Sequence, residues 1–490
     1  MSGIVSYGAY LPYWRLQRGA IGQSLGSGGG KGTRSVASFD EDSTSMGVES
    51  GRIALAAAPQ DYSPHVVAFA TTAPAYADKT NATAIHAALA LPDDVPAFDA
   101  VGAIRSGIGA VVMARALGGL AVLSDVRTGR PGSADEAGGG DAAVTLAFGD
   151  DGVIAEVVGS ASVSVEFTDR WRGPGDSYAQ IWEERFGEHA YVPLAEQAVT
   201  AALKDSGIAL DDIDHVIVTG SHARAVKAAA KAIGAAPTAL VDDLSAEIGN
   251  AGTAHWALLL ADVLDRAEPG QQIAVVLLAD GCDVWLLRTT DAVVTNRPAV
   301  SVRDRIAATR DDLTYPQFLT WRGFLEREPP RRPEPDRVAA PPSARTDAWK
   351  YAFVGSRDSD GFVYLPPSRV SLGSGEIDQM EPVPMADVRG TIATFTVDRL
   401  AFSLSPPVVA AIIDFDGGGR FQCELTDVDP AAVKIGDRVE MTFRRLYTSG
   451  GIHNYFWKAR PLTAEGPETP GAQAAEHTDT ARPLAAEGEA

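Results

Sequence analysis

The fold of this chain is decided by VVAFATTAPAYADKTNATAIHAALAL, residues 66–91. It begins with a short apolar run of strand length, and its last part, NATAIHAALAL, has the composition of a helix. Another strand-like run, GLAVLSDV, follows at 119–126. Apolar runs that alternate with alanine-rich helical stretches, from Ile4 to about Asp150, indicate an α/β fold.

The same alternation is repeated farther along the chain, from about Val153 to Thr290. Strands are predicted at HVIVTG (215–220) and QIAVVLLADG (272–281), with alanine-rich helices between them. Two α/β segments of similar size favour an internally duplicated fold, which we divide into residues 1–165 and 166–325.

The C-terminal third changes to a β pattern. The segment EREPPRRPEPDRVAAPPSART (326–346) is rich in proline and charge, which predicts a semi-rigid linker over 326–347. Beyond it, short strands separated by glycine, proline and aspartate turns predict a small all-β barrel within 348–462. These strands are GTIATFTV (390–397), PPVVAAIIDFD (406–416), RFQCELTDV (420–428) and GDRVEMTFRRL (436–446). Residues 463–490 have almost no bulky apolar side chains and predict a disordered tail.

Composition narrows the class of protein. A chain of 490 residues with 45% hydrophobic content is long and apolar enough to bury at least two cores. Its formal charge of −22 argues against nucleic acid, which requires a basic face, although an anionic coenzyme could still bind at a local arginine cluster. Cys282 and Cys423 form no disulfide framework, and neither a signal peptide nor a membrane span is predicted. These features predict a cytoplasmic protein.

Four segments carry a resemblance to a known family. They are YGAYLPYWRL (7–16), FDEDSTSMGVESGRIAL (39–55), TDRWRGPGDSY (168–178) and YPQFLTWRGFL (315–325). Their order resembles that of the archaeal-type 3-hydroxy-3-methylglutaryl-coenzyme A (HMG-CoA) synthases of the thiolase superfamily, over about residues 1–325. The resemblance implies a duplicated five-layer thiolase-like fold. It also implies the acyltransfer chemistry of that family, which uses a cysteine, a histidine and a glutamate.

Each of these three catalytic positions holds another residue type. The turn that opens the central helix reads VGAIRSGIGA (101–110), and it places Ile104 where the resemblance implies the cysteine. An isoleucine cannot form a thioester. Thr72 takes the glutamate position and Thr219 the histidine position, while His222 is either a substitute for the histidine or, more simply, a surface-loop residue. Loss of all three groups indicates a site that has abandoned cysteine chemistry.

The resemblance also implies residues that contact a ligand. Gly249-Asn250 in EIGNAGTA (247–254) is similar to the loop whose asparagine supports the thioester carbonyl, although a structural turn before a buried helix explains it equally well. A coenzyme A (CoA) thioester would be the ligand, bound by Arg224, with Arg172 and Arg105 as weaker candidates. Each arginine could instead be solvated or belong to an ion pair.

The segment 348–460 resembles the rubredoxin-like ribbon and OB-fold proteins that accompany thiolases and acyl-CoA enzymes. The resemblance is carried by WKYAFVGSR (349–357), LPPSRV (365–370), QMEPVPMADVRGTIATFTV (379–397), SPPVVAAIIDFDGGGRFQCELTDV (405–428), IGDRVEMTFRRL (435–446) and NYFWKARP (454–461). In that family two Cys-x-x-Cys pairs bind zinc ahead of the barrel. Serines stand in the corresponding segment here: Ser356, Ser359, Ser371 and Ser374. Neutral hydroxyls are poor zinc ligands, so we predict no metal and a ribbon held by packing.

Three functional hypotheses follow. The favoured one is a protein that handles acyl-CoA without an acyl-cysteine, as a subunit that works with a thiolase in acyl-CoA or lipid metabolism. The second is an aldolase-like enzyme that makes or breaks a carbon–carbon bond in an acyl-CoA without a covalent intermediate. Its base would be Tyr76, Asp78 or His222, each of which is more simply structural, with Asn250 as an oxyanion contact.

The third hypothesis keeps the family activity of an HMG-CoA synthase or ketoacyl synthase III. This activity would have to use Cys282 or Cys423, and neither lies in a turn that opens a helix. Cys282 is interpreted mainly as a small buried apolar residue. The resemblance also implies a homodimer or a complex with a thiolase. The acidic charge and the lack of a predicted membrane span favour neither nucleic acid nor membrane as a partner.

Overall fold

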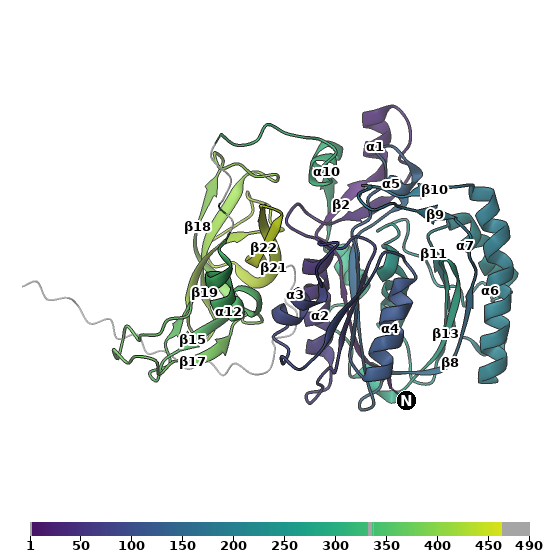
Figure 1. Ribbon diagram of the computed structural model, residues 1–490, viewed down its shortest axis with the longest axis horizontal. Helices are drawn as coiled ribbons and strands as arrows, with labels where there is room; N and C mark the ends of the chain where they lie inside the picture. The colour runs from purple at the N-terminus through teal and green to yellow at the C-terminus, as the bar shows by residue number, and fades with distance from the viewer. Residues whose placement is uncertain (1, 332–335, 337, 463–490) are drawn as a thin grey trace, which may run out of the picture.

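A computed structural model describes residues 2–331, 336 and 338–462 of the chain (Figure 1). An α/β part, which ends near residue 325, packs beside a β-rich C-terminal part. The predicted tail, 463–490, lies outside the described residues. No helix in the described segments has the length and apolarity that crossing a membrane requires.

The α/β part is built on a nine-stranded mixed sheet in the order β11-β12-β13-β8-β1-β7-β6-β4-β5. Its strands are β1 (Gly3–Tyr10), β4 (Val67–Thr71), β5 (Ala97–Val101), β6 (Leu120–Asp125), β7 (Ala142–Gly149), β8 (Ala155–Ser164), β11 (His215–Gly220), β12 (Gln272–Leu278) and β13 (Gly281–Thr289). The apolar runs used to predict the fold form β4, β6, β11 and β12, and nearly all of their residues are buried. The α/β prediction is therefore confirmed.

The two ends of this sheet have the same topology. In the first half, β4 pairs in parallel with β5 and β6, and β6 continues antiparallel through β7 to β1. In the second half, β11 pairs in parallel with β12, which continues antiparallel through β13 to β8. A parallel bridge from Val216 to Leu240 takes the place that β5 has in the first half. This repeat agrees with the predicted duplication, and a pairing of Ile4 with Ala155 joins the halves.

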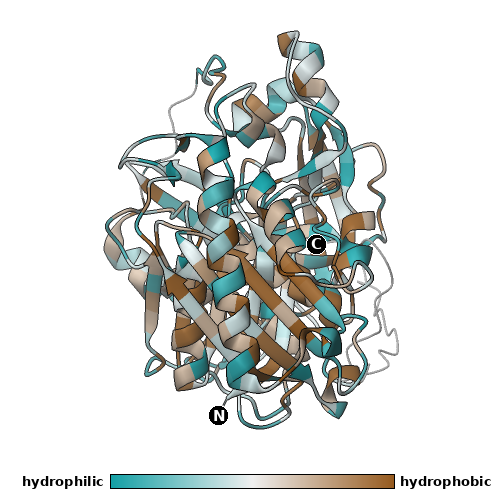
Figure 2. Cartoon of the chain, turned by 90° about the vertical axis from the view of Figure 1, so that its right-hand side faces the viewer, coloured by the Kyte–Doolittle hydropathy of each residue, from teal (hydrophilic) through white to brown (hydrophobic). Residues whose placement is uncertain are grey.

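Helices lie on both sides of each half of the sheet (Figure 1). α2 (Ser43–Ala57) packs on β1 and β7, and α6 (Glu184–Ser206) packs on β8 and β13. α4 (Ser106–Leu117) covers β4 and β6 on the inner side, next to α8 (His255–Leu264). Every residue of α8 is buried because its apolar side chains surround the whole helix. Seen from the side of α6, hydrophobic strands lie behind helices with hydrophilic outer faces (Figure 2).

The remaining helices and strands of the α/β part lie around the large sheet. They are β2 (Trp14–Gln17), α1 (Arg18–Leu25), β3 (Thr33–Val36), α3 (Ala82–Ala88), α5 (Ala134–Gly138), β9 (Arg170–Trp171), β10 (Gln180–Ile181), α7 (Ala223–Ala232), α9 (Val302–Ala307), β14 (Arg310–Leu313) and α10 (Tyr315–Trp321). In Figure 1, β2, α1, α5, β9, β10 and α10 lie along its upper edge, while α3 lies beside α2 and α7 beside α6. The strands β14, β2 and β3 form a small sheet, so the end of the α/β part returns to its beginning. The strands β9 and β10 form a hairpin of their own.

The C-terminal part contains a closed barrel, as predicted, with the order β18-β19-β20-β22-β21. Its strands are β18 (Gly390–Asp398), β19 (Val408–Phe415), β20 (Arg420–Leu425), β21 (Arg438–Ser449) and β22 (Ile452–Pro461). A ribbon of β15 (Val354–Arg357), β16 (Val363–Tyr364) and β17 (Glu381–Pro384) precedes the barrel, after α11 (Ala340–Arg345) and α12 (Asp347–Ala352). The helix α11 lies within the segment predicted as a linker.

Buried charges hold the barrel against α2 and the segment before it. We call this group the interdomain cluster: Asp40, Glu41 and Glu49 from the α/β part, with Asp427, Arg444, Lys458 and Arg460 from the barrel. Arg444 lies 2.6 Å from Glu41 and 2.5 Å from Asp427, while Lys458 lies 2.9 Å from Asp40. Since leaving any of these charges unpaired away from water would be costly, the cluster fixes how the two parts sit together.

Candidate functional site

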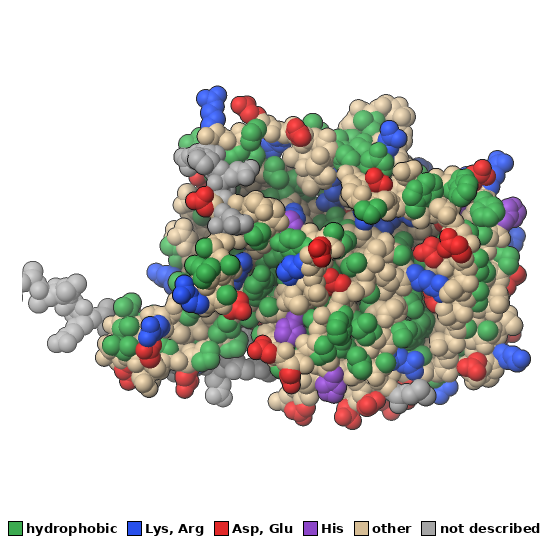
Figure 3. Space-filling model, viewed as in Figure 1, with side chains coloured by type: hydrophobic (Ala, Val, Ile, Leu, Met, Phe, Trp, Pro, Cys, Tyr) green, Lys and Arg blue, Asp and Glu red, His purple; other side chains and the backbone are tan. Residues whose placement is uncertain are grey.

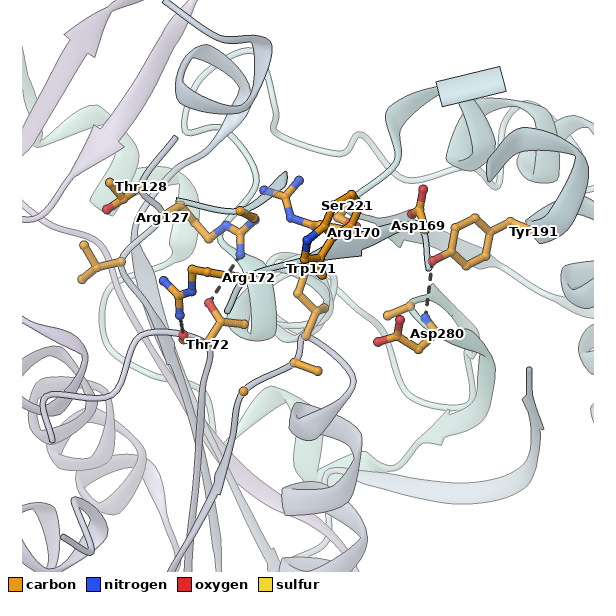
Figure 4. Close-up of a pocket in the computed structure, with 16 residues that line it drawn as sticks. Thr72, Arg127, Thr128, Asp169, Arg170, Trp171, Arg172, Tyr191, Ser221 and Asp280 are labelled. Atoms are coloured by element: carbon orange, nitrogen blue, oxygen red, sulfur yellow. Dashed lines mark hydrogen bonds between the residues drawn. The ribbon is translucent and has the colours of Figure 1, made fainter. Parts of the chain in front are cut away.

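A small pocket of about 100 Å³ lies between the two halves of the α/β part (Figure 4). Its lining comes from the end of β4, the turn before α4, the loop after β6, the β9–β10 hairpin, α6, the loop after β11 and the turn between β12 and β13. The lining residues are Thr72, Gly102, Ala103, Ile104, Val126, Arg127, Thr128, Asp169, Arg170, Trp171, Arg172, Ala179, Tyr191, Ser221, Ala279 and Asp280. This list contains no cysteine, histidine or glutamate.

Ile104 lies in the turn that opens α4 and contributes its side chain to the pocket wall. It is 8% exposed and belongs to the main apolar core, together with Ile108 one turn farther along the helix. An aliphatic group at this point offers neither a nucleophile nor a proton. The wall of the pocket is therefore chemically inert where the resemblance implies the acyl-accepting thiol.

Thr72 also lines the pocket, directly after β4, and its hydroxyl is engaged. The hydroxyl lies 2.9 Å from Asp125 Oδ1, and the backbone N–H of Thr72 donates to the same oxygen. The other carboxylate oxygen of Asp125 accepts from the backbone N–H of Thr253. Because Thr72 donates to Asp125, its oxygen is left to accept, and Arg127 Nη1 approaches it at 3.4 Å. Thr72 is thus a link in a hydrogen-bond network.

Thr219, His222 and Asn250 lie near the pocket without lining it. Thr219 is buried within β11. His222 is a buried cap of α7, since its Nδ1 accepts the backbone N–H of Ala225 at 3.1 Å. Asn250 donates to the carbonyl of Gly220 at 3.0 Å and accepts from a backbone N–H two residues later. The structure thus gives His222 and Asn250 local structural partners.

The two other suggested bases lie away from the pocket. Tyr76 faces the barrel, where its hydroxyl accepts the backbone N–H of His453 at 2.7 Å and its ring lies 4.8 Å from the His453 imidazole. Asp78 is exposed on the loop before α3. The structure therefore does not bring Tyr76 or Asp78 to the pocket.

The three arginines suggested for CoA binding have different surroundings. Arg105 donates to Asp283 at 2.8 Å and also to Ser162 and Ser164, so it ties the start of α4 to β8 and β13. Arg172 is exposed at the pocket rim and donates to the carbonyl of Thr72. Arg224 is exposed in the first turn of α7.

Neither cysteine is placed for nucleophilic chemistry. Cys282 lies in β13 and Cys423 in β20, and both are buried. Burial raises the pKa of each thiol to about 12, so that almost no thiolate forms near neutral pH. Cys282 is packed in the apolar cluster between α6 and the second half of the sheet, as interpreted from the sequence.

Sequence reasoning missed the charged groups that dominate the pocket. Arg127 and Arg172 lie at one end beside Thr72, while Asp169, Tyr191 and Asp280 lie at the other (Figure 4). Burial raises the pKa of Asp280, and burial followed by nearby Asp169 raises that of Tyr191. Only the TDRWRG motif pointed to part of this set, through Arg172.

Hydrogen bonds engage all four ribbon serines, of which Ser356 and Ser371 are buried and Ser359 and Ser374 are exposed. Asp358 accepts from Ser371 at 2.7 Å and from Tyr364 at 2.9 Å, while Ser356 exchanges hydrogen bonds with Ser368. Ser359 donates to Glu376, and the backbone N–H of Ser374 donates to Ser371. The ribbon was predicted to be held by packing, and the structure adds polar contacts centred on Asp358 that join its segments. Within the described residues, no group of three or more His, Cys, Asp or Glu side chains is arranged to hold a metal ion.

Family models match two segments of the chain. One is the 3-oxoacyl-[acyl-carrier-protein] synthase III C-terminal domain, over residues 203–284. The other is the C-terminal OB-fold domain of ChsH2, over residues 382–444. These matches fall on the second α/β half and on the barrel.

The α/β part is also similar to whole proteins. A hydroxymethylglutaryl-CoA synthase of Thermococcus kodakarensis is 30% identical over 311 residues, which are 60% of this chain and 88% of that protein. Its counterpart in Methanopyrus kandleri is 27% identical over 348 residues, 66% of this chain and 98% of the relative. A solved HMG-CoA synthase complexed with CoA has a TM-score of 0.56 at 15% identity, over 65% of this chain and 89% of that one. That last likeness concerns the fold alone.

Proposed function

Since the chain belongs to the hydroxymethylglutaryl-CoA synthase family and carries a C-terminal ChsH2-type OB-fold, we propose that it handles acyl-CoA thioesters without forming an acyl-cysteine. One observation carries the proposal: Ile104 opens α4 at the wall of a pocket whose lining has no cysteine, histidine or glutamate. The protein would bind its thioester non-covalently, as a subunit that works with a thiolase in acyl-CoA or lipid metabolism. This role places it in the cytoplasm.

We propose that two thiolase-like halves, predicted at 1–165 and 166–325, make up a five-layer part. The strand β8 (Ala155–Ser164) belongs to the second half and not to the first, because it pairs with β13. The linker 326–347 leads to the ribbon and OB-fold domain at 348–462, followed by the tail, 463–490. Because the interdomain cluster is buried, we propose that the barrel acts as a fixed part of the subunit and does not move as a separate arm.

Coenzyme binding is assigned to one of the three candidate arginines. Arg224 is exposed in the first turn of α7, whereas Arg172 lines the pocket and donates to the Thr72 carbonyl. Arg105 receives a structural role instead, because its guanidinium is bound by Asp283 and two serines. The phosphates of the coenzyme are the groups that an exposed arginine recognises.

An apolar edge of the sheet supports an assembly with a second subunit. β5 is the last strand of the nine-stranded sheet, and it exposes Phe98 and Val101. Val112 and Leu117 are exposed on α4 nearby, and hydrophobic side chains gather in this region of the surface (Figure 3). Because unpaired edges with apolar neighbours favour strand pairing, we propose that β5 pairs with a second copy or with a thiolase.

A second candidate function is favoured by the acidic end of the pocket. Asp280 and Tyr191 meet there, where the Tyr191 hydroxyl accepts the backbone N–H of Asp280 at 3.4 Å. A carboxyl group of raised pKa in a pocket can exchange a proton with a bound thioester, as an aldolase-like reaction requires. Asp280 would replace Tyr76, Asp78 and His222 as the base of that reaction. The active condensing enzyme is the weakest hypothesis, since both thiols are buried.

Intact-mass spectrometry tests the main proposal. The purified protein is incubated with acetyl-CoA and acetoacetyl-CoA, next to a cysteine-containing HMG-CoA synthase as positive control. We expect an acyl adduct on the control and none on this protein, while isothermal titration calorimetry detects non-covalent binding of the thioesters. An acyl adduct that maps to Cys282 would overturn the proposal and identify a condensing enzyme with a displaced nucleophile.

A further inference from the structure

Two guanidinium groups, those of Arg127 and Arg172, lie at one end of the pocket. Arg127 Nη1 lies 3.4 Å from Thr72 Oγ1, and Arg172 donates to the Thr72 carbonyl (Figure 4). Arg170, beside them, is paired with Asp135. Across the described part of the chain, no carboxylate oxygen lies within 4.0 Å of the guanidinium nitrogens of Arg127 or Arg172. The three arginines thus face two nearby carboxylates, Asp125 and Asp135, which leaves an excess of positive charge at this end of the pocket.

The surroundings of Arg127 favour an incoming anion. Burial, together with repulsion from Arg170, lowers the pKa of Arg127. Asp125 and Asp135 oppose this lowering in part, but the oxygens of Asp125 accept hydrogen bonds from Thr71, Thr72 and Thr253 and not from the guanidinium. An enclosed cation without an ion pair gains most from a ligand that brings a negative charge and accepts hydrogen bonds.

The position of Arg127 is fixed by the fold. Its backbone N–H donates to Asp141 Oδ1 at 2.7 Å, and its carbonyl accepts from Arg34 at 2.8 Å. Its side chain passes two glycines, Gly139 and Gly252, where an added Cβ would lie 3.1 Å from side-chain carbons of Arg127. Gly252 also has a positive φ of 57°, which disfavours any other residue. The space that Arg127 occupies is thus provided by the backbone around it.

We propose that Arg127 and Arg172 form a carboxylate-binding subsite. The ligand class is an acyl-CoA whose acyl chain ends in a carboxylate, or the corresponding free dicarboxylate. This inference deepens the proposed function, because it names the substrate of the same pocket. A volume of about 100 Å³ suits a short acyl chain better than a long one. The planar guanidinium can donate to both oxygens of a carboxylate. An acyl chain of the same length that ends in a methyl group offers no such acceptor.

Matched thioesters test the subsite by titration calorimetry. Malonyl-CoA is compared with propionyl-CoA, and glutaryl-CoA with pentanoyl-CoA, so that each pair differs in the terminal group and not in chain length. We expect the carboxylate member of at least one pair to bind about tenfold more tightly or better, the value of a charge-assisted hydrogen bond. Arg127→Gln and Arg172→Gln should reduce this preference, and Arg127→Lys should keep part of it. Arg130→Gln, on the exposed part of the same loop, is the control and should leave the preference unchanged.

The outcomes separate the subsite from the proposed function. Equal binding of both members of each pair would overturn the subsite while leaving a non-covalent acyl-CoA protein. Free malonate or glutarate that binds without CoA and depends on Arg127 would support the subsite and assign it to the free acid, against the CoA part of the proposed function. Binding of no thioester and no free acid would overturn both. Thermal melts of each variant show whether it is folded before its affinity is compared.

Discussion

Replacing Arg444 should reveal how strongly the barrel is held to the α/β part. Its side chain is fully buried and faces three carboxylates: Glu41 at 2.6 Å, Asp427 at 2.5 Å and Asp40 at 3.7 Å. Arg444→Met keeps much of the volume and removes the charge. Removing one partner of a buried ion pair costs about 3–5 kcal/mol, so we expect Arg444→Met to lower the free energy of unfolding by this amount at pH 8.

The loss should depend on pH with a defined sign. Burial raises the pKa of Glu41 to about 7 and raises that of Asp427, whereas Arg444 lowers both. Without Arg444 the two pKa values rise further, while in the unfolded chain they stay near 4. A carboxyl group whose pKa is higher in the folded state than in the unfolded state destabilises the fold fully at pH values above the folded-state pKa. This destabilisation disappears at pH values below the unfolded-state pKa, where the group is protonated in both states. The difference between wild type and Arg444→Met should therefore be largest at pH 8 and shrink as the pH falls toward 5.

Urea titrations at pH 8 and pH 5.5 measure this difference through tryptophan fluorescence, because Trp457 packs against Phe443 in the barrel core. The control is Arg420→Met, which removes an exposed ion pair with Asp414 on the same barrel and should change the midpoint little. A loss below about 1 kcal/mol at pH 8, or a loss of equal size at both pH values, would refute the assignment of the cluster as the buried attachment of the barrel.

Three further predictions concern the thiols, the ribbon and the sheet edge. Iodoacetamide at pH 8 should leave Cys282 and Cys423 unmodified in the folded protein and alkylate both in urea, because burial raises both thiol pKa values to about 12. Rapid alkylation of the native protein, detected by mass spectrometry, would contradict their burial. Asp358→Ala should loosen the ribbon because Ser371, Tyr364 and the backbone N–H of Phe362 lose their acceptor, and limited proteolysis should then cut between residues 356 and 380. Zinc analysis of the wild-type protein should find no stoichiometric metal. Phe98→Asp should shift the mass measured by light scattering toward that of the monomer, because it places a charge on the exposed edge strand β5. Val165→Asp, at another exposed apolar residue, is the control. An unchanged mass for Phe98→Asp would exclude β5 as the contact between subunits.

Part of the site could be located from the sequence. The family resemblance placed Ile104 in the turn before α4 and Thr72 at the end of β4, and both residues line the pocket. Thr219, His222 and Asn250 were placed near it by the same reasoning, but the sequence does not reveal that two of these side chains are held by backbone groups. Arg127 gave no signal, because an arginine after a strand is ordinary until its neighbours are known.

What the sequence by itself determined is what depends on neighbours along the chain. Apolar runs and turn residues repeat over short distances, so they predicted the α/β alternation, the change to β structure and the strands of the barrel. Only the tertiary structure decided which charges meet. Lys458 pairs with Asp40, and Arg172 comes to lie beside Arg127, through packing that no local pattern encodes. Whether a charged side chain is solvated, buried in an ion pair or left to bind a ligand depends on those distant neighbours, and the function proposed here depends on that outcome.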